Sequence, residues 1–383
     1  MLSIYVHIPF CEKKCPYCDF YSIPMSGLAV PQKEYAVVLA AQLKRDAAEY
    51  GLADREVGSI FFGGGTPSLM APEFFEEVLA AIAGSMKIVK DAEISSESNP
   101  ASADAPWFRG LKKAGVNRVT VGVQSFSDEN LKKLGRIHDS REAKRAVAEA
   151  LDAGFRSVGM DLIYGISGES AKDVEADLKS AMSFQPQHIS AYQLTIEDTT
   201  PMYDAVVHGR TLLPDDDEIL SQMRTVLRIL TLGGWRRYEI SNFAKSGFEC
   251  RHNMNYWRYG EYLGLGSGAV SFLKLKNEEL FAKRFSRVRD MKAYLSGDIL
   301  EKEVDELTIH DAMSEFCFMA LRTEMGISKS AFEKEFGIGF EDAYAGIAAE
   351  LVKEKVAEQD GDNLKLTERG LEISNQIFEM FIK

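Results

Sequence analysis

The chain lacks the features that mark membrane-spanning and disulfide-stabilised proteins. None of its apolar runs approaches the roughly 18 residues that a spanning helix needs, and no basic stretch followed by an apolar run and a cleavage site opens the sequence. Its five cysteines are too few for a disulfide scaffold in a chain of 383 residues. We therefore expect a cytoplasmic protein with no membrane span and no secretory signal.

Positive charge is also scarce. The 45 Lys and Arg residues are outnumbered by 58 Asp and Glu residues, which gives a formal net charge of −13 at pH 7. Affinity for nucleic acid and for anionic membranes depends on positive charge that neutralises phosphates. The composition is otherwise that of a globular protein with ample core, with 45% hydrophobic and 27% charged residues. The sequence therefore predicts no nucleic-acid partner.

Short apolar, β-branched runs alternate with amphipathic helical patterns over about the first 200 residues. Such alternation is typical of parallel strands joined by helical crossovers. Six units favour an α/β fold built as a partial (β/α)6 TIM-like barrel, and a doubly wound open sheet is the alternative. The predicted strands are 3–8, 59–62, 91–96, 118–123, 157–163 and 188–194. The predicted helices are 32–50, 72–83, 107–114, 141–153 and 171–183.

The pattern changes after Trp235, and this change divides the chain into three predicted domains. Residues 1–235 would form the barrel, residues 236–300 an extension, and residues 301–383 a C-terminal α+β domain. In the extension we expect one strand at 236–243, followed by an aperiodic stretch rich in glycine and aromatic residues.

The C-terminal domain is expected to open with a helical run from residue 301 and to resemble a winged helix. An Asp-Gly-Asp-Asn turn at 360–363 predicts a pair of short strands. Winged helices commonly bind DNA, but this domain holds 9 Lys and Arg residues against 19 Asp and Glu residues. A net charge of −10 favours a protein-packing or lid module instead. The predicted helices are 311–322, 329–336 and 340–355.

Three of the five cysteines, Cys11, Cys15 and Cys18, follow the first predicted strand within eight residues. In a reducing compartment such a cluster indicates metal binding or redox chemistry. Three thiolates can hold one polynuclear centre, and a 4Fe–4S cluster with three cysteine ligands leaves one iron open. A zinc site would need a fourth ligand, for which His7 is a candidate. A glutaredoxin-type dithiol formed by Cys15 and Cys18 would leave Cys11 unexplained.

The segment from Tyr5 to Phe20, with its C-x3-C-x2-C spacing, resembles the radical S-adenosylmethionine (SAM) superfamily and within it the HemN/HemW branch. The resemblance covers nearly the whole chain, because further motifs follow successive predicted strands. Active sites of parallel barrels are built at these carboxyl ends of the strands. The motifs are GGGTP at 63–67, ESNP at 97–100, GVQSF at 122–126 and DLIYG at 161–165.

The resemblance implies that Cys11, Cys15 and Cys18 hold a 4Fe–4S cluster whose open iron is chelated by the amino and carboxylate groups of SAM. A one-electron reductant would then allow the cluster to split the SAM sulfonium and release a 5′-deoxyadenosyl radical. The residues implied to line the SAM pocket are Tyr5, Tyr17, Gly64, Gly65, Thr66, Glu97, Gln124, Arg136 and Asp161. Within this set, Arg136 suits a carboxylate and Asp161 suits the ribose hydroxyls.

Three features separate the haem chaperones of this branch from its oxygen-independent coproporphyrinogen III oxidases. The oxidases carry a further cysteine where this chain has Phe20, and an extra segment before the first strand, which here begins at Ser3. The run His252-Asn253-x-x-Tyr256-Trp257 is similar to the HNxxYW signature of the chaperones. The resemblance implies a protein that binds haem as cargo and delivers it to haem-requiring acceptor proteins. The alternative is an oxidase that decarboxylates propionates to vinyl groups.

The side chain that would ligate the haem iron is left open by the sequence. His252 can ligate iron through its imidazole, and the neighbouring Tyr256 and Trp257 can pack on a porphyrin face. Cys250 is a second candidate. No residue is assigned a catalytic role, and no surface for a homodimer is identified, so the oligomeric state is equally open.

Overall fold

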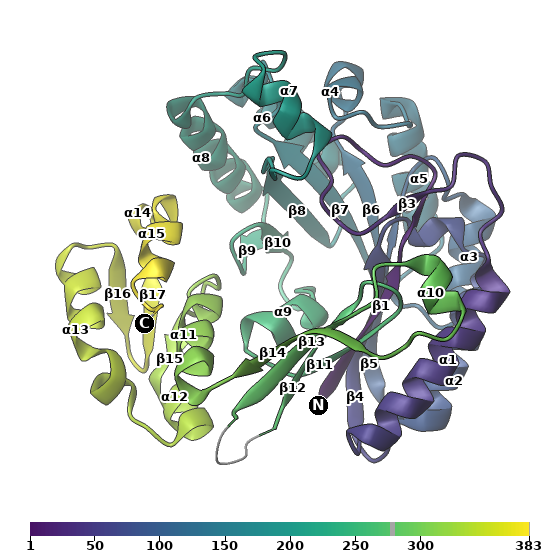
Figure 1. Cartoon of the computed structure of the whole chain (residues 1–383). Helices are drawn as coiled ribbons and strands as arrows, with labels where there is room; N and C mark the ends of the chain where they lie inside the picture. The colour runs from purple at the N-terminus through teal and green to yellow at the C-terminus, as the bar shows by residue number, and fades with distance from the viewer. Residues whose placement is uncertain (276–279, 383) are drawn as a thin grey trace.

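The computed structural model describes residues 1–275 and 280–382, and its core is a twelve-stranded sheet (Figure 1). Six neighbouring strands run parallel in the order of the sequence. A doubly wound sheet would reverse its strand order partway, so the sequential order confirms the predicted partial (β/α)6 barrel. The six strands are β1 (Leu2–Ile8), β4 (Glu56–Gly64), β5 (Lys87–Ser98), β6 (Arg118–Gln124), β7 (Ser157–Tyr164) and β8 (His188–Gln193).

Helices cover the outer side of these strands, as Figure 1 shows. Their starts follow local sequence: Asp139 and Ser170 form capping boxes with Glu142 and Asp173, which satisfy amides of the first helical turn. The long helices are α1 (Gln32–Glu49), α2 (Pro72–Ser85), α3 (Ala105–Lys113), α5 (Ser140–Asp152), α6 (Ala171–Ser183) and α8 (Asp216–Leu232). The short elements are β2 (Phe10–Cys11), β3 (Ile23–Pro24), a 3-10 turn (Pro67–Leu69), α4 (Asp128–Lys133) and α7 (Pro201–Val207).

The prediction of one strand at 236–243 is wrong, because the chain turns back on itself there. The Tyr238 amide donates to the Asn242 carbonyl at 3.1 Å, which separates two short antiparallel strands, β9 (Arg236–Arg237) and β10 (Asn242–Ala244). β10 also pairs with β8 and so extends that edge of the barrel sheet.

The rest of the extension continues the opposite edge of the same sheet. β11 (Tyr262–Leu265) runs parallel to β1, and three antiparallel strands follow it. The extension therefore contains regular elements, of which β11 pairs with a strand far away in the chain and β12 and β13 pair with their neighbours. These elements are α9 (Arg251–Trp257), β11, β12 (Val270–Lys274), β13 (Ala282–Arg287) and α10 (Met291–Leu295).

The expectation of a helix from residue 301 is also wrong, since β14 (Glu301–Leu307) is a strand of the main sheet. Its charged residues pair across β13, with Glu301 2.5 Å from Lys283 and Asp305 3.2 Å from Arg284. Cross-strand pairs of opposite charge stabilise a sheet without an apolar alternation.

The predicted winged-helix-like unit follows β14. Its aromatic core centres on Phe332, Phe340 and Tyr344, which are nearly inaccessible to solvent. Its elements are α11 (Ile309–Ala320), β15 (Ile327–Ser328), α12 (Lys329–Phe336), α13 (Phe340–Lys353), β16 (Ala357–Asp360), β17 (Asn363–Leu366), α14 (Glu368–Glu372) and α15 (Ser374–Glu379). Among the residues that the structure describes, no helix is both long and apolar enough to cross a membrane.

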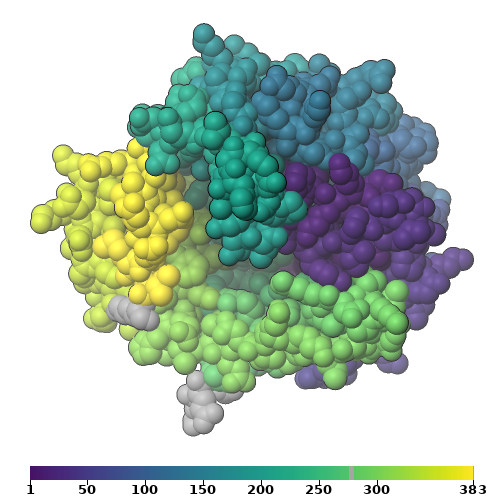
Figure 2. All heavy atoms as spheres, turned by 45° about the horizontal axis from the view of Figure 1, so that its top comes forward, coloured from purple at the N-terminus to yellow at the C-terminus, as the bar shows by residue number. Residues whose placement is uncertain are grey.

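The winged-helix-like unit lies beside the extension strands and α9 (Figure 1). Figure 2 shows the surface hollowed between this unit, in yellow and yellow-green, the purple N-terminal segment and the teal segment that contains α7. Residues of β1, of the loop that follows it and of α11 line one cavity.

Candidate functional site

The three clustered cysteines lie on one loop at the carboxyl end of β1. The loop is anchored by the short parallel pair of β2 and β3, and the Cys18 amide donates to the Cys15 carbonyl at 3.2 Å. Cys11, Cys15 and Cys18 are each partly exposed and line a single cavity of about 510 Å³. No helix follows Cys18 within the loop, although a glutaredoxin-type dithiol would open one.

The surroundings of the cysteines suit an iron–sulfur cluster. The Thr66 hydroxyl donates to the Cys11 sulfur at 3.4 Å and Arg136 donates to the Cys15 sulfur at 3.6 Å, as donors around cluster sulfurs do. Burial raises the pKa of the Cys11 and Cys18 thiols. Within the described residues, no three His, Cys, Asp or Glu side chains are already gathered around a metal position.

His7, the candidate fourth ligand of a zinc site, does not line the cysteine cavity. Its Nδ1 lies 2.9 Å from the Tyr5 hydroxyl and its Nε2 lies 2.8 Å from the Tyr21 carbonyl. Both ring nitrogens are thus engaged. Burial lowers the pKa of His7 to about 4, opposed by the Tyr21 hydrogen bond and assisted by the charge of Arg289.

The glycine motif after β4 needs glycine for steric reasons. Gly64 has φ of +110°, and a Cβ there would lie 2.4 Å from the His7 ring. A Cβ on Gly65 would lie 2.7 Å from the carbonyl oxygens of Ile8 and Phe10, because the Gly65 amide donates to Ile8 at 2.8 Å. The motif therefore packs tightly against the end of β1.

Two carboxyl groups, of Glu97 near the end of β5 and of Asp161 within β7, face the cavity that the cysteines line. Burial, with a further contribution from Asp161, raises the pKa of Glu97 to about 8, although the Gly64 amide donates to it at 3.2 Å. Burial raises the pKa of Asp161 to about 6, opposed by the Ser190 hydroxyl and by arginine charge. Perturbed acids that face a cavity are typical of ligand sites, and hydroxyl or ammonium groups would suit them.

The end of β6 completes this side of the cavity. Gln124 holds φ of +67°, a strained conformation for a residue with a side chain. Arg136 donates to the Gly122 carbonyl at 3.1 Å and also to the Tyr17 hydroxyl. Of the residues predicted for the cluster and SAM, those that line this cavity are Cys11, Cys15, Tyr17, Cys18, Gly64, Gly65, Thr66, Glu97, Gln124, Arg136 and Asp161.

Tyr5 is the one predicted SAM residue that lies outside this cavity. It lines a neighbouring barrel cavity of about 250 Å³, which shares Glu97 and Asp161 with the cysteine cavity. The sequence prediction missed Arg118 and His188, which line this barrel cavity and each keep one buried nitrogen without a partner. Arg118 and His188 begin β6 and β8, and the run from His188 to Glu197 resembles the family, but the sequence gave neither residue a chemical role.

The HNxxYW motif lies in α9. The buried carboxylate of Glu93 accepts hydrogen bonds from the first turn of this helix and so fixes its position. Oε1 of Glu93, on β5, accepts the His252 amide at 3.0 Å and the Cys250 thiol at 3.4 Å. The Cys250 side chain lines the barrel cavity, and burial raises its pKa to about 12. α9 thereby places Tyr256 between the barrel cavity and a second cavity on the side of α11, which Trp257 also lines.

The His252 imidazole is fully buried, with both nitrogens in hydrogen bonds. Nδ1 lies 2.9 Å from the Ser59 hydroxyl and Nε2 lies 2.8 Å from the Tyr256 hydroxyl. The ring stacks on Phe61 with centroids 5.1 Å apart, and burial lowers its pKa to about 3. To bind iron, His252 would have to give up one of these hydrogen bonds, so its role as a haem ligand stays a prediction.

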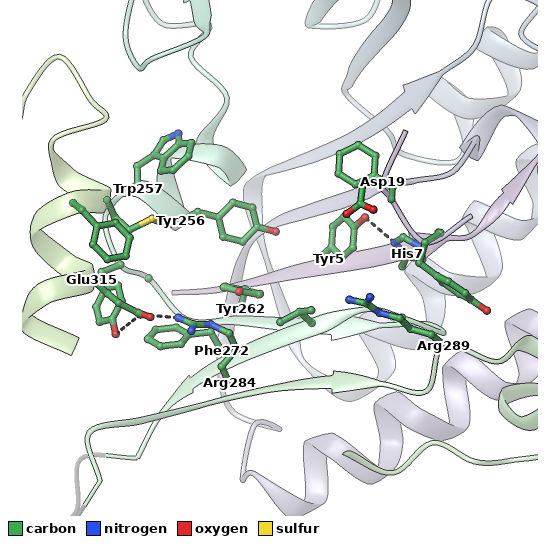
Figure 3. Close-up of a pocket in the computed structure, with 18 residues that line it drawn as sticks. Tyr5, His7, Asp19, Tyr256, Trp257, Tyr262, Phe272, Arg284, Arg289 and Glu315 are labelled. Atoms are coloured by element: carbon green, nitrogen blue, oxygen red, sulfur yellow. Dashed lines mark hydrogen bonds and ion pairs between the residues drawn. The ribbon is translucent and has the colours of Figure 1, made fainter. Parts of the chain in front are cut away.

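A further large cavity, of about 670 Å³, lies between the sheet and α11 (Figure 3). Nine of its eighteen lining residues are Phe, Tyr or Trp, including Tyr256 and Trp257. It adjoins the barrel cavity, because Tyr5, Phe20 and Tyr256 line both. Sequence patterns gave no sign of it, since its walls come from segments between residues 5 and 319.

Polar side chains hold one wall of this large cavity in place. On α11, Glu315 accepts hydrogen bonds from Arg284 at 2.6 Å and from the Tyr259 hydroxyl at 2.9 Å (Figure 3). Arg284 also pairs with Asp305 at 3.2 Å. The contacts tie the C-terminal domain to the extension strands directly at the cavity.

The fold and the cysteine loop are those of radical SAM proteins. Residues 5–181 match the model of the Radical SAM superfamily, and residues 307–373 match that of the HemN C-terminal domain. Coproporphyrinogen III oxidase (HemN) from Escherichia coli, described as a radical SAM enzyme, has the same fold, with a TM-score of 0.80 and 22% identity. That match covers 100% of this chain and 90% of the oxidase.

Similar curated proteins indicate which family of the radical SAM superfamily the chain belongs to. The haem chaperones HemW of Haemophilus influenzae and Escherichia coli are each 36% identical, over 383 and 390 residues, covering 100% of this chain and 98% of each relative. HemW of Bacillus subtilis is 31% identical over 388 residues, covering 100% of this chain and 99% of that protein. The chain therefore belongs to the HemW family of the radical SAM superfamily.

Proposed function

We propose that this protein is a haem chaperone that binds haem and delivers it to haem-requiring acceptor proteins. The observation that carries the proposal is the aromatic cavity of about 670 Å³, whose walls include Tyr256 and Trp257 of the HNxxYW motif. Aromatic faces suit a porphyrin ring, which is large, flat and apolar. Family membership supports the same cargo, because the relatives are named haem chaperones.

The same proposal includes a resident 4Fe–4S cluster on Cys11, Cys15 and Cys18, with SAM beside it. Thr66 and Arg136 would hydrogen-bond the cluster end of the cavity, where both already reach cysteine sulfurs. The cluster, once a one-electron donor has reduced it, supplies the electron that cleaves a SAM sulfonium.

The carboxyl groups of Glu97 and Asp161 would bind the ribose end of SAM. As acceptors they suit the hydroxyl groups of a ribose, and both line the cavity that the cysteines also line. Arg136, placed between this end and the cysteines, suits the carboxylate of the methionyl group.

An anaerobic haemin titration of the cluster-reconstituted protein, followed by the Soret band, tests the chaperone function. We expect saturable binding of one haem per chain, and transfer of that haem to an apo-haemoprotein. Absence of saturable binding would overturn the proposal, and decarboxylation of coproporphyrinogen would then be the activity to assay. The His252→Ala variant belongs in the same titration, since unchanged affinity would exclude His252 as the ligand.

The cofactor part of the proposal is tested separately. Cys15→Ala should lower the iron and sulfide content of the reconstituted protein, and SAM should bind the intact protein in equilibrium dialysis. Cys317→Ala is the matched control, because that cysteine is buried in the C-terminal domain, away from the loop. Equal iron and sulfide in the wild type and Cys15→Ala would contradict the assignment of the cluster.

A further inference from the structure

Haem iron in a protein takes an axial ligand from a histidine, methionine, cysteine or tyrosine side chain. Among the described residues that line the large cavity, His7 carries the only imidazole, and its two nitrogens already hydrogen-bond to Tyr5 and Tyr21. The Tyr256 and Tyr259 hydroxyls are committed to His252 and Glu315. These groups would each lose an existing hydrogen bond on binding iron.

Met319 is different from these groups. It lines the cavity from α11, and its thioether needs neither deprotonation nor release from a strong hydrogen bond before it can coordinate a metal. It also lies four residues after Glu315, so both side chains occupy the same face of the helix. Because Arg284 and Tyr259 hold Glu315 against the cavity, they also keep the face that carries Met319 turned towards it.

A second cavity residue has the charge that a haem propionate needs. Arg289 lies at the end of the cavity opposite Glu315 (Figure 3). Among the described residues it has no hydrogen bond or ion-pair partner, whereas Arg284 is paired with Glu315 and Asp305. An exposed guanidinium beside an aromatic cavity suits a carboxylate, with which it can form two parallel hydrogen bonds.

We propose that Met319 supplies an axial thioether ligand to the haem iron and that Arg289 binds a propionate of the same haem. This inference rests on the proposed function and names the groups that hold the cargo. Met319 lies on α11 of the C-terminal domain. Coordination of the haem iron by Met319 would therefore connect this domain, through the haem, to the barrel side of the cavity. A single neutral thioether is a weaker anchor than a thiolate, which suits a protein that must hand its haem on.

The axial ligand is tested with the variant Met319→Leu, which keeps the apolar volume and removes the sulfur. Haemin and metal-free protoporphyrin IX are titrated into full-length, cluster-reconstituted protein. We expect the variant to bind haemin about tenfold more weakly and protoporphyrin IX equally well. Near-infrared magnetic circular dichroism of the haemin complex should show a thioether band that the variant lacks. Met325→Leu, at a methionine that is 60% exposed and outside the cavity, is the matched control.

The propionate contact is tested with Arg289→Gln. This variant should weaken haemin and protoporphyrin IX alike, by about tenfold, and should leave the affinity for their dimethyl esters unchanged. Arg258→Gln, at an exposed arginine that does not line the cavity, should change none of these affinities.

The outcomes distinguish this inference from the proposed function. Equal haemin affinity in the wild type and Met319→Leu, or an equal loss for metal-free porphyrin, would overturn axial ligation while the chaperone function stands. Undiminished affinity of Arg289→Gln would overturn the propionate contact. If wild-type protein binds no haemin saturably, the proposed function itself fails.

Discussion

Glu97 and Gln124, which line the same cavity as the cysteines, are both held in energetically unfavourable states. Glu97 is a buried acid whose pKa is raised to about 8, and Gln124 adopts a left-handed backbone conformation. Neither state is visible in the sequence, which shows only the residue types and their place after a strand. Costs of this kind are typical of ligand sites, because a bound ligand supplies the missing partners.

The raised pKa of Glu97 predicts a pH-dependent stability. Between its ordinary value of 4.5 and about 8, the folded protein keeps a proton that the unfolded chain has lost, so stability falls as pH rises through this range. Glu97→Gln should remove this loss and raise the free energy of unfolding at pH 8.5 by up to about 5 kcal/mol, with little change at pH 4.5. Urea titrations of SAM-free protein at the two pH values measure the difference.

The control for this measurement is Glu56→Gln. Glu56 is an exposed acid on the same sheet whose pKa is lowered by Lys87, so it should give no gain at pH 8.5. An equal stability of Glu97→Gln and the wild type at both pH values would show that Glu97 is ionised in the fold.

A second residue-scale prediction concerns the glycine motif. Gly64→Ala should lower the free energy of unfolding by at least about 2 kcal/mol, since the new methyl group meets the His7 ring and φ is +110°. Gly84→Ala, in α2 with open space around it, should be neutral or stabilising by about 0.5 kcal/mol. Denaturant midpoints compare the two variants. Equal midpoints would mean that the end of β1 yields to accommodate the side chain.

At the scale of elements, the six parallel strands were predictable because each carries a buried apolar run of its own. β1, for example, is buried along nearly its whole length. β14 was not predictable, since its middle residues are charged and exposed and its stability comes from pairing with β13. The hairpin of β9 and β10 was missed for the same reason, because pairing with β8 decides it.

α9 is an element whose position depends on one distant carboxylate. Glu93→Ala removes the acceptor of the His252 amide and leaves Arg118, 3.8 Å away, as a buried unpaired charge. The variant should lose about 3 kcal/mol of stability and bind haemin more weakly, because Tyr256 and Trp257 lie on α9. Urea and haemin titrations measure both effects.

Glu93→Gln is the informative companion variant, since its amide oxygen still accepts the His252 hydrogen bond but carries no charge. It should retain more stability and more haemin affinity than Glu93→Ala. Equal losses in the two variants would show that the charge opposite Arg118, and not the hydrogen bond at the start of α9, positions the helix.

At the scale of the whole molecule, the C-terminal domain closes one side of the large cavity, so haem release should require α11 to move. The ion pair of Lys274 and Glu335, 2.9 Å apart and partly buried, joins β12 to α12. Glu335→Gln should weaken this contact and speed haemin transfer to apomyoglobin by about fivefold. Stopped-flow absorbance measures the transfer rate.

The ion pair of Arg224 and Glu372 provides the control, because it joins α8 to α14 at the surface. Neither residue lines the large cavity or the barrel cavity. Glu372→Ala should leave the transfer rate unchanged, as expected for an exposed pair. A rate unchanged in Glu335→Gln as well would indicate that haem leaves without movement of the C-terminal domain.

The sequence by itself determined what depends on neighbours along the chain. The spacing of Cys11, Cys15 and Cys18 puts three thiols on one loop whatever the rest of the fold does. Local alternation likewise specified the barrel strands and the helices between them. The acidic composition of the winged-helix-like unit predicts that it does not bind DNA.

Only the tertiary structure decided the properties that arise from burial and from contacts between distant segments. It enclosed His252 between Ser59 and Tyr256, and it brought Met319 to a cavity that Tyr5 also lines. A cavity wall and a shifted pKa both depend on which groups exclude water from one another, and that is set by packing across the whole chain.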